Sequence, residues 1–214
     1  MKLKYKKDIF KKKIILDNNN FQVMMEWEKP YMKDLVKNLS PKGDVLEIGF
    51  GLGYSASYIQ QHNIKSHTII EDSPEVLKHL KKWSLKQKHK VIIIEGTWQN
   101  SLKHLGVFDS VFFDDSPHDN HPDLHNIRIY DFYHQLSLQH VKKGSRLTWY
   151  CDKPIYWVCH PLTKWSIKSK KIRIPRNCKY INSTNKVYMP LIIFKTGLIK
   201  DMTKFVIYPS NITV

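Results

Sequence analysis

Three glycines at alternate positions, Gly49, Gly51 and Gly53, constrain the fold of this chain more than any other feature. They directly follow the apolar segment of residues 44–48, which has the length of a buried strand, and they precede a helix-like segment at residues 55–61. Glycine lets a backbone approach a ligand closely, and a loop that enters a helix presents free N–H groups. The sequence therefore predicts a strand, a ligand-binding turn and a helix, the unit from which nucleotide-binding α/β folds are built.

Strand-like and helix-like segments alternate along most of the chain, which predicts a Rossmann-like α/β fold with a mostly parallel sheet. The expected strands are residues 44–48, 67–70, 90–94, 108–113 and 146–150, and the expected helices are residues 26–39, 55–61, 74–85 and 127–140. Pro30 suits the first turns of its helix, and Ser73 suits an N-cap. Residues 186–196 and 205–208 are expected to form a C-terminal hairpin, whereas residues 151–176 show only weak periodicity. We expect a basic N-terminal arm at residues 1–22 and one domain at residues 23–214.

The composition limits which classes of protein this chain can belong to. With 214 residues, of which 42% are hydrophobic and 25% charged, the chain is expected to form a globular domain with a sizeable core. Three separated cysteines, no signal peptide and no apolar run of membrane-spanning length lead us to expect a cytoplasmic protein without membrane contact. The net charge of +16 attracts polyanions, so weak binding of nucleic acid is expected. Because the lysines are spread along the chain, a lysine-rich solvated surface is the alternative.

Two acids and a tryptophan favour S-adenosylmethionine as the ligand of the glycine turn. Glu47 lies just before the glycines, where a carboxylate suits a cationic amine and disfavours a pyrophosphate. Glu71 closes the next predicted strand, where an acid can accept both hydroxyls of a ribose. Trp98 follows the third strand and can stack on an adenine. A doubly wound domain that binds a different nucleotide, or none, is the alternative.

Several segments resemble the guanidinoacetate N-methyltransferase family. Residues 23–32 read V-M-M-E-W-E-K-P-Y-M and are similar to that family's V-M-x-x-W-E-x-P-Y-M. Residues 46–51 (L-E-I-G-F-G) resemble its L-E-V-G-F-G, residues 96–98 (G-T-W) its G-L-W, and residues 178–180 (C-K-Y) its C-R-Y. The resemblance covers residues 22–151 closely and 174–195 loosely, and fungal-type arginine δ-N-methyltransferases share much of it. It implies a class I methyltransferase fold, S-adenosylmethionine as cofactor, and a small guanidino compound, guanidinoacetate- or arginine-like, as methyl acceptor.

The resemblance also implies residue roles. Two carboxylates hold the substrate guanidinium in that family, and they match Glu28 and Asp114, of which Asp114 is also the proton acceptor. A guanidinium presents a planar fork of donors that suits bidentate binding by carboxylates, and it arrives protonated, so a base must take a proton as its nitrogen attacks. Without these roles, Glu28 would be a solvated acid at a helix N-terminus and Asp114 a turn residue. The residues expected at the cofactor are Met24, Met32, Glu47, Gly49, Phe50, Gly51, Leu52, Gly53, Tyr54, Glu71, Asp72, Thr97 and Trp98.

Three departures from the family pattern bear on the acceptor. The family's Y-D-T-Y-P is replaced by F-D-D-S-P at residues 113–117, which makes Asp115 a further candidate for substrate binding. The family's N-L-T is replaced by D-K-P at residues 152–154, so we expect Asp152 and Lys153 at the acceptor, with Lys153 binding a carboxylate. The region of residues 151–175 is shorter than its counterpart, which would leave the sheet open or completed by a partner chain.

Other functions stay open. His118, His121 and His125 have a spacing that suits one helix face, but methyl transfer from a sulfonium needs no metal, and we expect a polar active-site loop there and no metal. A methyltransferase-fold protein that binds RNA or a protein partner without turnover is one alternative. A nucleic-acid methyltransferase is another, disfavoured because no N-P-P-Y or D-P-P-Y box follows the fourth strand. We expect a monomer or a homodimer.

Overall fold

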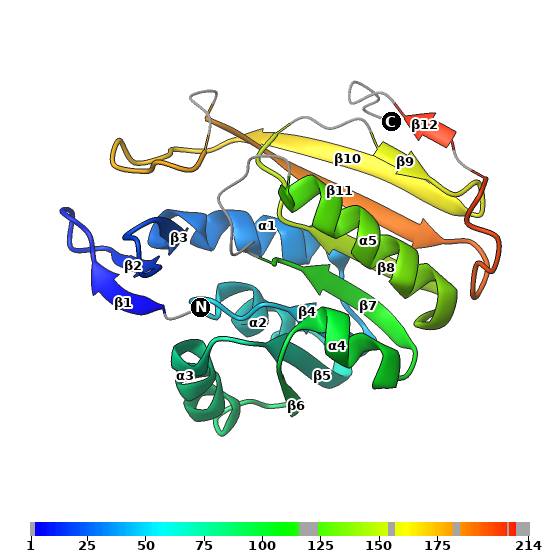
Figure 1. Ribbon diagram of the computed structural model, residues 1–214, viewed down its shortest axis with the longest axis horizontal. Coiled ribbons are helices and arrows are strands. Elements are labelled where there is room, and N and C mark those ends of the chain that lie inside the picture. The colour runs from blue at the N-terminus through cyan, green and yellow to red at the C-terminus, as the bar shows by residue number, and fades with distance from the viewer. Residues whose placement is uncertain (1–2, 116–123, 154–156, 182–184, 205, 209–214) are drawn as a thin grey trace.

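The computed structural model describes residues 3–115, 124–153, 157–181, 185–204 and 206–208 (Figure 1). Within these residues a seven-stranded sheet has the order β10-β11-β8-β7-β4-β5-β6. Its parallel strands are β4 (Gly43–Ile48), β5 (Ile64–Glu71), β6 (Lys90–Glu95), β7 (Phe108–Phe113) and β8 (Val141–Trp149). The antiparallel strands β11 (Lys186–Phe194) and β10 (Thr163–Lys171) extend the sheet beyond β8. The predicted Rossmann-like α/β fold is confirmed.

Helices cover both faces of this sheet, and each face has its own core. A short 3-10 turn, η1 (Glu26–Glu28), leads into α1 (Lys29–Leu39), which packs with α2 (Tyr54–Ile59) and α3 (Pro74–Ser84) on one face. On the other face lie α4 (Trp98–Ser101), η2 (Leu102–His104) and α5 (Leu124–Gln139). The period of the apolar residues explains α1, because Tyr31, Met32, Leu35, Val36 and Leu39 are all buried. None of the described helices is long and apolar enough to span a membrane.

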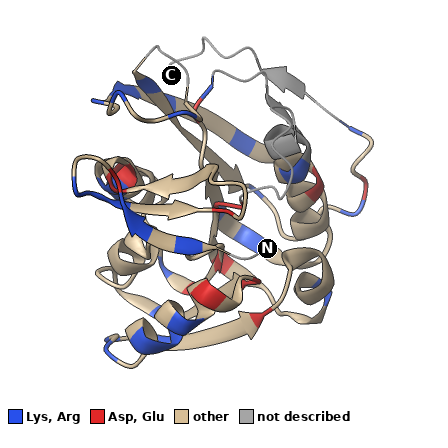
Figure 2. Cartoon of the chain, turned by 60° about the vertical axis from the view of Figure 1, so that its left-hand side comes forward, with Lys and Arg blue, Asp and Glu red and all other residues tan. Residues whose placement is uncertain are grey.

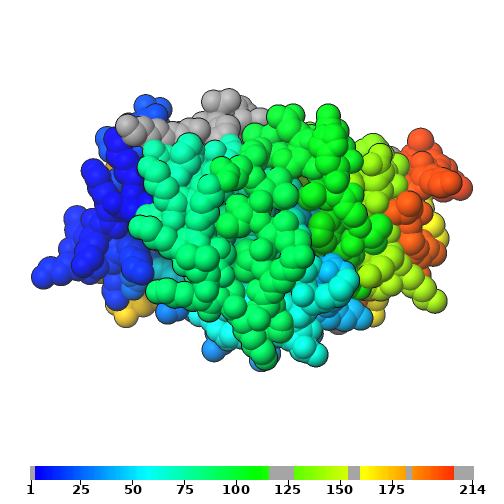
Figure 3. Space-filling view, turned by 90° about the horizontal axis from the view of Figure 1, so that it is seen from below, coloured from blue at the N-terminus to red at the C-terminus, as the bar shows by residue number. Residues whose placement is uncertain are grey.

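Residues 3–22, expected to belong to a basic arm, contribute instead to a small antiparallel sheet, the N-terminal sheet. Its strands are β1 (Lys4–Lys7), β2 (Lys13–Leu16) and β3 (Gln22–Met25). Leu3, Ile14 and Ile15 are buried although lysines surround them in sequence. Tyr5 donates a hydrogen bond to the carbonyl of Gly51 (2.8 Å), and its ring lies 4.0 Å from that of His79 in α3. These strands, blue in Figure 3, therefore pack directly against α3. The division of the chain at residue 22 stays a prediction.

The C-terminal strands pair differently from the prediction. Residues 186–196 were expected to form a hairpin with residues 205–208, but β11 pairs with β10, and β12 (Val206–Tyr208) pairs with β9 (Trp157–Cys159). The sequence conceals β10 because it is an edge strand in which only Thr163 and Ile167 are buried. β8 also begins before the predicted residue 146 and includes residues 142–144, expected as a turn. Pro30 occupies the first turn of α1 as predicted, whereas the Ser73 side chain makes no capping hydrogen bond.

A buried polar contact joins β4 to β5. Glu47 Oε2 lies 2.8 Å from His67 Nε2, and neither side chain is exposed to solvent. Gln60 Nε2 approaches the other ring nitrogen of His67 at 3.4 Å. A buried carboxylate lowers the stability of the folded state unless a polar partner is present. Removing that partner leaves an uncompensated charge in the interior, which is strongly destabilising.

We therefore expect His67→Phe to lower the free energy of unfolding by about 3–5 kcal/mol, the cost of leaving one member of a buried pair alone. Lys65→Ala is the matched control, because the ion pair of Lys65 with Asp44 on the same two strands is exposed and should contribute less than about 1 kcal/mol. Chemical denaturation monitored by circular dichroism measures both. Equal effects of the two changes would show that Glu47 does not depend on His67.

Candidate functional site

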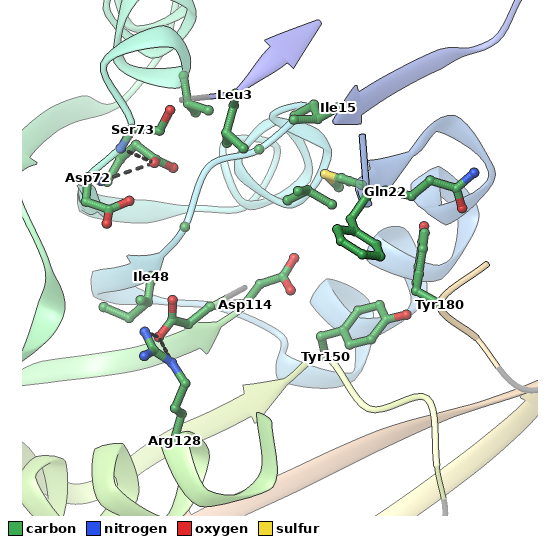
Figure 4. Close-up of a pocket in the computed structure, with 18 of the residues that line it drawn as sticks. Leu3, Ile15, Gln22, Ile48, Asp72, Ser73, Asp114, Arg128, Tyr150 and Tyr180 are labelled. Atoms are coloured by element: carbon green, nitrogen blue, oxygen red, sulfur yellow. Dashed lines mark hydrogen bonds and ion pairs between the residues drawn. The ribbon is translucent and has the colours of Figure 1, made fainter. Parts of the chain in front are cut away.

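A cavity of about 650 Å³ opens at the carboxyl ends of the parallel strands, beneath the N-terminal sheet (Figure 4). In Figure 4, Asp72 and Ser73 lie on one side of it, and Tyr150 and Tyr180 lie on the other. Leu3, Ile15 and Met24 close it from the N-terminal sheet. Apolar walls with a few convergent polar groups are typical of a small-molecule site.

Two glycines let the turn after β4 fit between its neighbours. Gly49 has φ +80°, and a Cβ there would lie 2.2 Å from the carbonyl oxygen of Asp114. Gly51 has φ +52°, and a Cβ there would lie 2.6 Å from the sulfur of Met24. Only glycine adopts these angles and tolerates these distances without strain. The turn is thus locked between β3 and the residue that follows β7.

Glu71 organises the same turn from the end of β5. Its carboxylate accepts backbone hydrogen bonds from Phe50 (2.9 Å), Asp72 (3.1 Å) and Ser73 (2.9 Å). Burial raises the pKa of Glu71 above its ordinary value, although these three bonds oppose the shift. A carboxylate can accept about four hydrogen bonds, so one acceptor position remains for a hydroxyl in the cavity.

Asp115 holds the ring of Trp98, which lines the cavity. Its Oδ2 accepts a hydrogen bond from Trp98 Nε1 (2.7 Å) and another from Arg128 Nε (2.7 Å). The ring of Trp98 also packs edge-on against Phe113 and Phe132. Asp115 was expected at the substrate, but its charge is already balanced by Arg128, because α5 brings that arginine over the end of β7.

Glu28 is the acid of the W-E-x-P-Y-M segment and reaches the cavity from η1. Its carboxylate accepts a hydrogen bond from the N–H of Met25 (2.7 Å), a capping arrangement that fixes the first turn. It accepts a second hydrogen bond from the hydroxyl of Tyr180 (2.5 Å). Only 2% of Glu28 is exposed. Burial and the nearby charge of Asp114 raise the pKa of Glu28 to about 8, despite the opposing hydrogen bond of Tyr180.

Asp114 follows β7 directly, and its backbone N–H donates to the carbonyl of Ile48 (3.0 Å). Burial, then the negative charges of Glu47, Asp115 and Glu71, raise the pKa of Asp114 to about 7. Two carboxyl groups with raised pKa values thus line one cavity from distant parts of the chain. A bound cation would favour the ionised form of both, which makes this end of the cavity complementary to a planar cation.

The guanidinoacetate N-methyltransferase family matches residues 11–159, well over half of the chain. The chain belongs to this family. Relatives named protein arginine N-methyltransferase 2 are 44% identical over 118 residues in Candida glabrata and 34% identical over 137 residues in Saccharomyces cerevisiae. These matches cover 53% and 61% of this chain, but only 28% and 32% of the two relatives' own lengths.

Solved structures show the same fold at low sequence identity. A Thermotoga maritima spermidine synthase aligns with a TM-score of 0.56 and 12% identity, over 94% of this chain and 75% of that one. A Bacillus cereus O-methyltransferase in complex with SAH aligns with a TM-score of 0.51 and 12% identity, over 80% of this chain and 82% of that one. The family and the fold are those of S-adenosylmethionine-dependent methyltransferases.

The cavity fits this cofactor. Gly49 and Gly51 have no Cβ, so the backbone of the turn can approach a ligand closely. Glu71 retains an acceptor position for a ribose hydroxyl. Thr97 and Trp98 line the cavity and would lie beside the adenine of the bound cofactor. Bound there, S-adenosylmethionine would supply an electrophilic methyl group on a sulfonium.

Twelve of the predicted site residues line the cavity: Met24, Glu28, Gly49, Gly51, Glu71, Asp72, Thr97, Trp98, Asp114, Asp115, Asp152 and Lys153. Six others lie elsewhere: Met32, Glu47, Phe50, Leu52, Gly53 and Tyr54. Met32 is buried in the core, and Glu47 contacts His67 between β4 and β5 and does not line the cavity, although its charge still acts on Asp114. Phe50 and Leu52 line a separate groove beside α3.

The sequence reasoning missed Gln22, Arg128 and Tyr180 as cavity residues. Tyr180 could have been predicted, because it is the last residue of the C-K-Y segment that resembles the family's C-R-Y. His118 and His121, part of the histidine pattern, lie outside the described residues, as does the side chain of His125. In the described part of the chain, no group of three metal-ligating side chains is found.

The raised pKa values predict how stability depends on pH. Glu28 and Asp114 lose their protons near pH 4 when unfolded but near pH 8 and pH 7 when folded. Between these values the folded state binds more protons, so the cofactor-free protein should lose stability as the pH rises from 5 to 8, at up to about 1.4 kcal/mol per pH unit for each group.

Denaturant titrations at several pH values test this dependence. In Glu28→Gln and in Asp114→Asn, the free energy of unfolding should decrease less steeply with pH than in the natural chain, because each change removes one of the two titrating groups. Parallel curves for the natural chain and both variants would mean that neither carboxyl retains its proton in the folded state.

Proposed function

We propose that this chain catalyses S-adenosylmethionine-dependent methylation of a guanidino nitrogen. One observation carries the proposal: Glu28 and Asp114, 86 positions apart in sequence, line the cavity that also contains the glycine turn and Glu71. The Glu28 carboxyl group is held by Met25 and Tyr180, Asp114 is fixed through its backbone N–H, and both carboxyl groups have raised pKa values, as expected where a cationic ligand completes the site.

The two carboxylates have different roles in this proposal. Glu28 binds the guanidinium through Oε2 and orients it, since Oε1 is held by Met25 and Tyr180. Asp114 binds the attacking nitrogen and accepts its proton as that nitrogen becomes more acidic, and a pKa near 7 suits a base that works at neutral pH. Localising the positive charge toward Glu28 leaves the attacking nitrogen more nucleophilic.

The acceptor proposed is a small guanidino compound such as guanidinoacetate or arginine. Lys153 and Lys179 line the same cavity and offer positive charge to a carboxylate at the far end of such a molecule. The relatives are named for arginine in proteins, and this chain matches only about a third of their length or less. A methylation assay with guanidinoacetate, arginine and an arginine-containing peptide, each with labelled cofactor, tests the proposal and separates these acceptors.

Asp114→Asn should lower kcat by about 10²- to 10⁴-fold, because it keeps the size of the side chain but removes the base. Cofactor affinity, measured by calorimetry, should stay unchanged. Glu28→Gln should instead raise the KM of the acceptor by about tenfold or more, because it removes a charge-assisted bond to the guanidinium.

Asp115→Asn is the control for this assignment, because Asp115 is adjacent and acidic but is paired with Arg128. It should retain most of kcat at saturating cofactor. If it abolishes transfer while Asp114→Asn does not, Asp115 is the base. If the natural chain methylates no guanidino compound although it binds the cofactor, a binding role without turnover replaces this proposal.

Nucleic-acid binding stays a secondary prediction from the net charge of +16. Short single-stranded RNA should bind weakly, without sequence preference, and its affinity should fall steeply between 50 and 200 mM salt, by about 300-fold if six phosphates are contacted. Fluorescence anisotropy measures this. Tight, sequence-selective binding at physiological salt would favour a nucleic-acid substrate.

A further inference from the structure

The segment of residues 177–180 is attached to the N-terminal sheet by a group of hydrogen bonds. Gln22 uses both ends of its amide: Nε2 donates to the carbonyl of Asn177 (2.7 Å), and Oε1 accepts from the N–H of Lys179 (2.7 Å). Asn177 Nδ2 in turn donates to Asp8 Oδ2 (2.9 Å). These residues are at least 155 positions apart in sequence, so the contacts exist only in the folded chain.

Tyr180 is the member of this segment that lines the cavity and contacts Glu28. Its ring stacks on that of Trp27, with centroids 6.2 Å apart and 29° between planes, and its hydroxyl donates to Glu28 Oε1 at 2.5 Å. The N–H of Met25 donates to the same oxygen at 2.7 Å. Both bonds go to Oε1, so Oε2 can accept from a ligand in the cavity.

We propose that Tyr180 is a positioning residue for Glu28, and that Gln22 fixes the segment that carries Tyr180. The consequence for the acceptor rests on the proposed function, whereas the position and ionisation of Glu28 do not. Figure 4 shows Gln22, Tyr150 and Tyr180 together on one side of the cavity. The N-terminal sheet thus contributes to the acceptor site through Tyr180 as well as covering the cavity.

A hydroxyl that donates to a carboxylate stabilises its charged form, and only the charged form of Glu28 binds a guanidinium well. Tyr180 therefore opposes the burial and the negative charges that raise the pKa of Glu28. The other titratable or charged groups near Glu28 or along the cavity wall are Tyr54, Glu71, Asp72, Asp114, Asp115, Arg128, Tyr150, Asp152, Lys153, Cys178 and Lys179. Their total effect leaves Glu28 only partly ionised near neutral pH, so the loss of one donor should be measurable.

The first test is independent of activity. The carboxyl carbon of Glu28 is titrated by NMR in the full-length, cofactor-free protein, and its signal is assigned by its absence in Glu28→Gln. Tyr180→Phe should move the titration midpoint to higher pH, and Gln22→Ala should move it in the same direction by less, because the tyrosine hydroxyl is still present. Tyr58→Phe is the matched control, because Tyr58 lies in α2, away from the cavity, and it should leave the midpoint unchanged.

The second test uses methyl transfer to guanidinoacetate and to arginine by the cofactor-saturated protein. At pH 7.5, Tyr180→Phe should raise the KM of the acceptor by about 10- to 100-fold, the range of one hydrogen bond to a charged group. That difference should shrink as the pH rises above 8, because Glu28 then becomes ionised in a growing fraction of both proteins. Because Tyr180 does not touch the proton acceptor, kcat and cofactor affinity should stay close to those of the natural chain.

An unchanged midpoint for Glu28 in Tyr180→Phe would overturn the proposal, as would a rise in KM of equal size at every pH. Should Tyr180→Phe fail to fold, Gln22→Ala decides by the same midpoint. If the natural chain transfers no methyl group to either acceptor, the proposed function fails, while the NMR titration still shows whether Tyr180 positions Glu28.

Discussion

The close backbone contact between the glycine turn and the end of β7 is the constraint on which the rest of the site depends. Gly49 donates to the carbonyl of Ile70 at 2.9 Å, and Asp114 donates to the carbonyl of Ile48 at 3.0 Å, so the carboxyl ends of β4, β5 and β7 are joined. A Cβ on Gly49 would lie 2.2 Å from the Asp114 carbonyl and would separate them. Because these strands are parallel, their ends meet at one edge of the sheet, and Glu71 and Asp114 share one cavity.

Charge is distributed unevenly in the folded chain. The protein has a net charge of +16, yet the cavity collects Glu28, Glu71, Asp114 and Asp115. Figure 2 shows acidic segments near the middle of the molecule and a basic stretch along the N-terminal strands. Of these four acids, Asp115 has the cation Arg128, and the others have raised pKa values. Like charges in a partly buried site are costly, so this end of the cavity gains stability when a cation binds.

The N-terminal sheet joins the first strands of the chain to residues 177–180 at this cavity. Tyr5 holds the glycine turn from above, Met24 packs on Gly51, and Gln22 binds the segment that carries Tyr180. A region that the sequence presented as a basic arm thus contacts both the glycine turn and the segment that carries Tyr180. Its apolar residues explain why it packs, because Leu3, Ile14 and Ile15 are buried among exposed lysines.

The sequence by itself determined the order of the main strands and helices from α1 to α5, the glycine turn, and the candidate pair Glu28 and Asp114, because these depend on local periodicity and on short motifs. It did not predict β1, β2 and β3 or the short helices α4 and η2. The structure decided what depends on contacts between distant residues. Strand alternation turned Glu47 toward His67 rather than toward the cavity, and α5 placed Arg128 against Asp115. Tyr180 reached Glu28 across 152 positions, and the edge strand β10, with few buried residues, gave no readable pattern. A local pattern records which face of an element is buried, whereas the partner that covers it is set by strand order and by long-range packing.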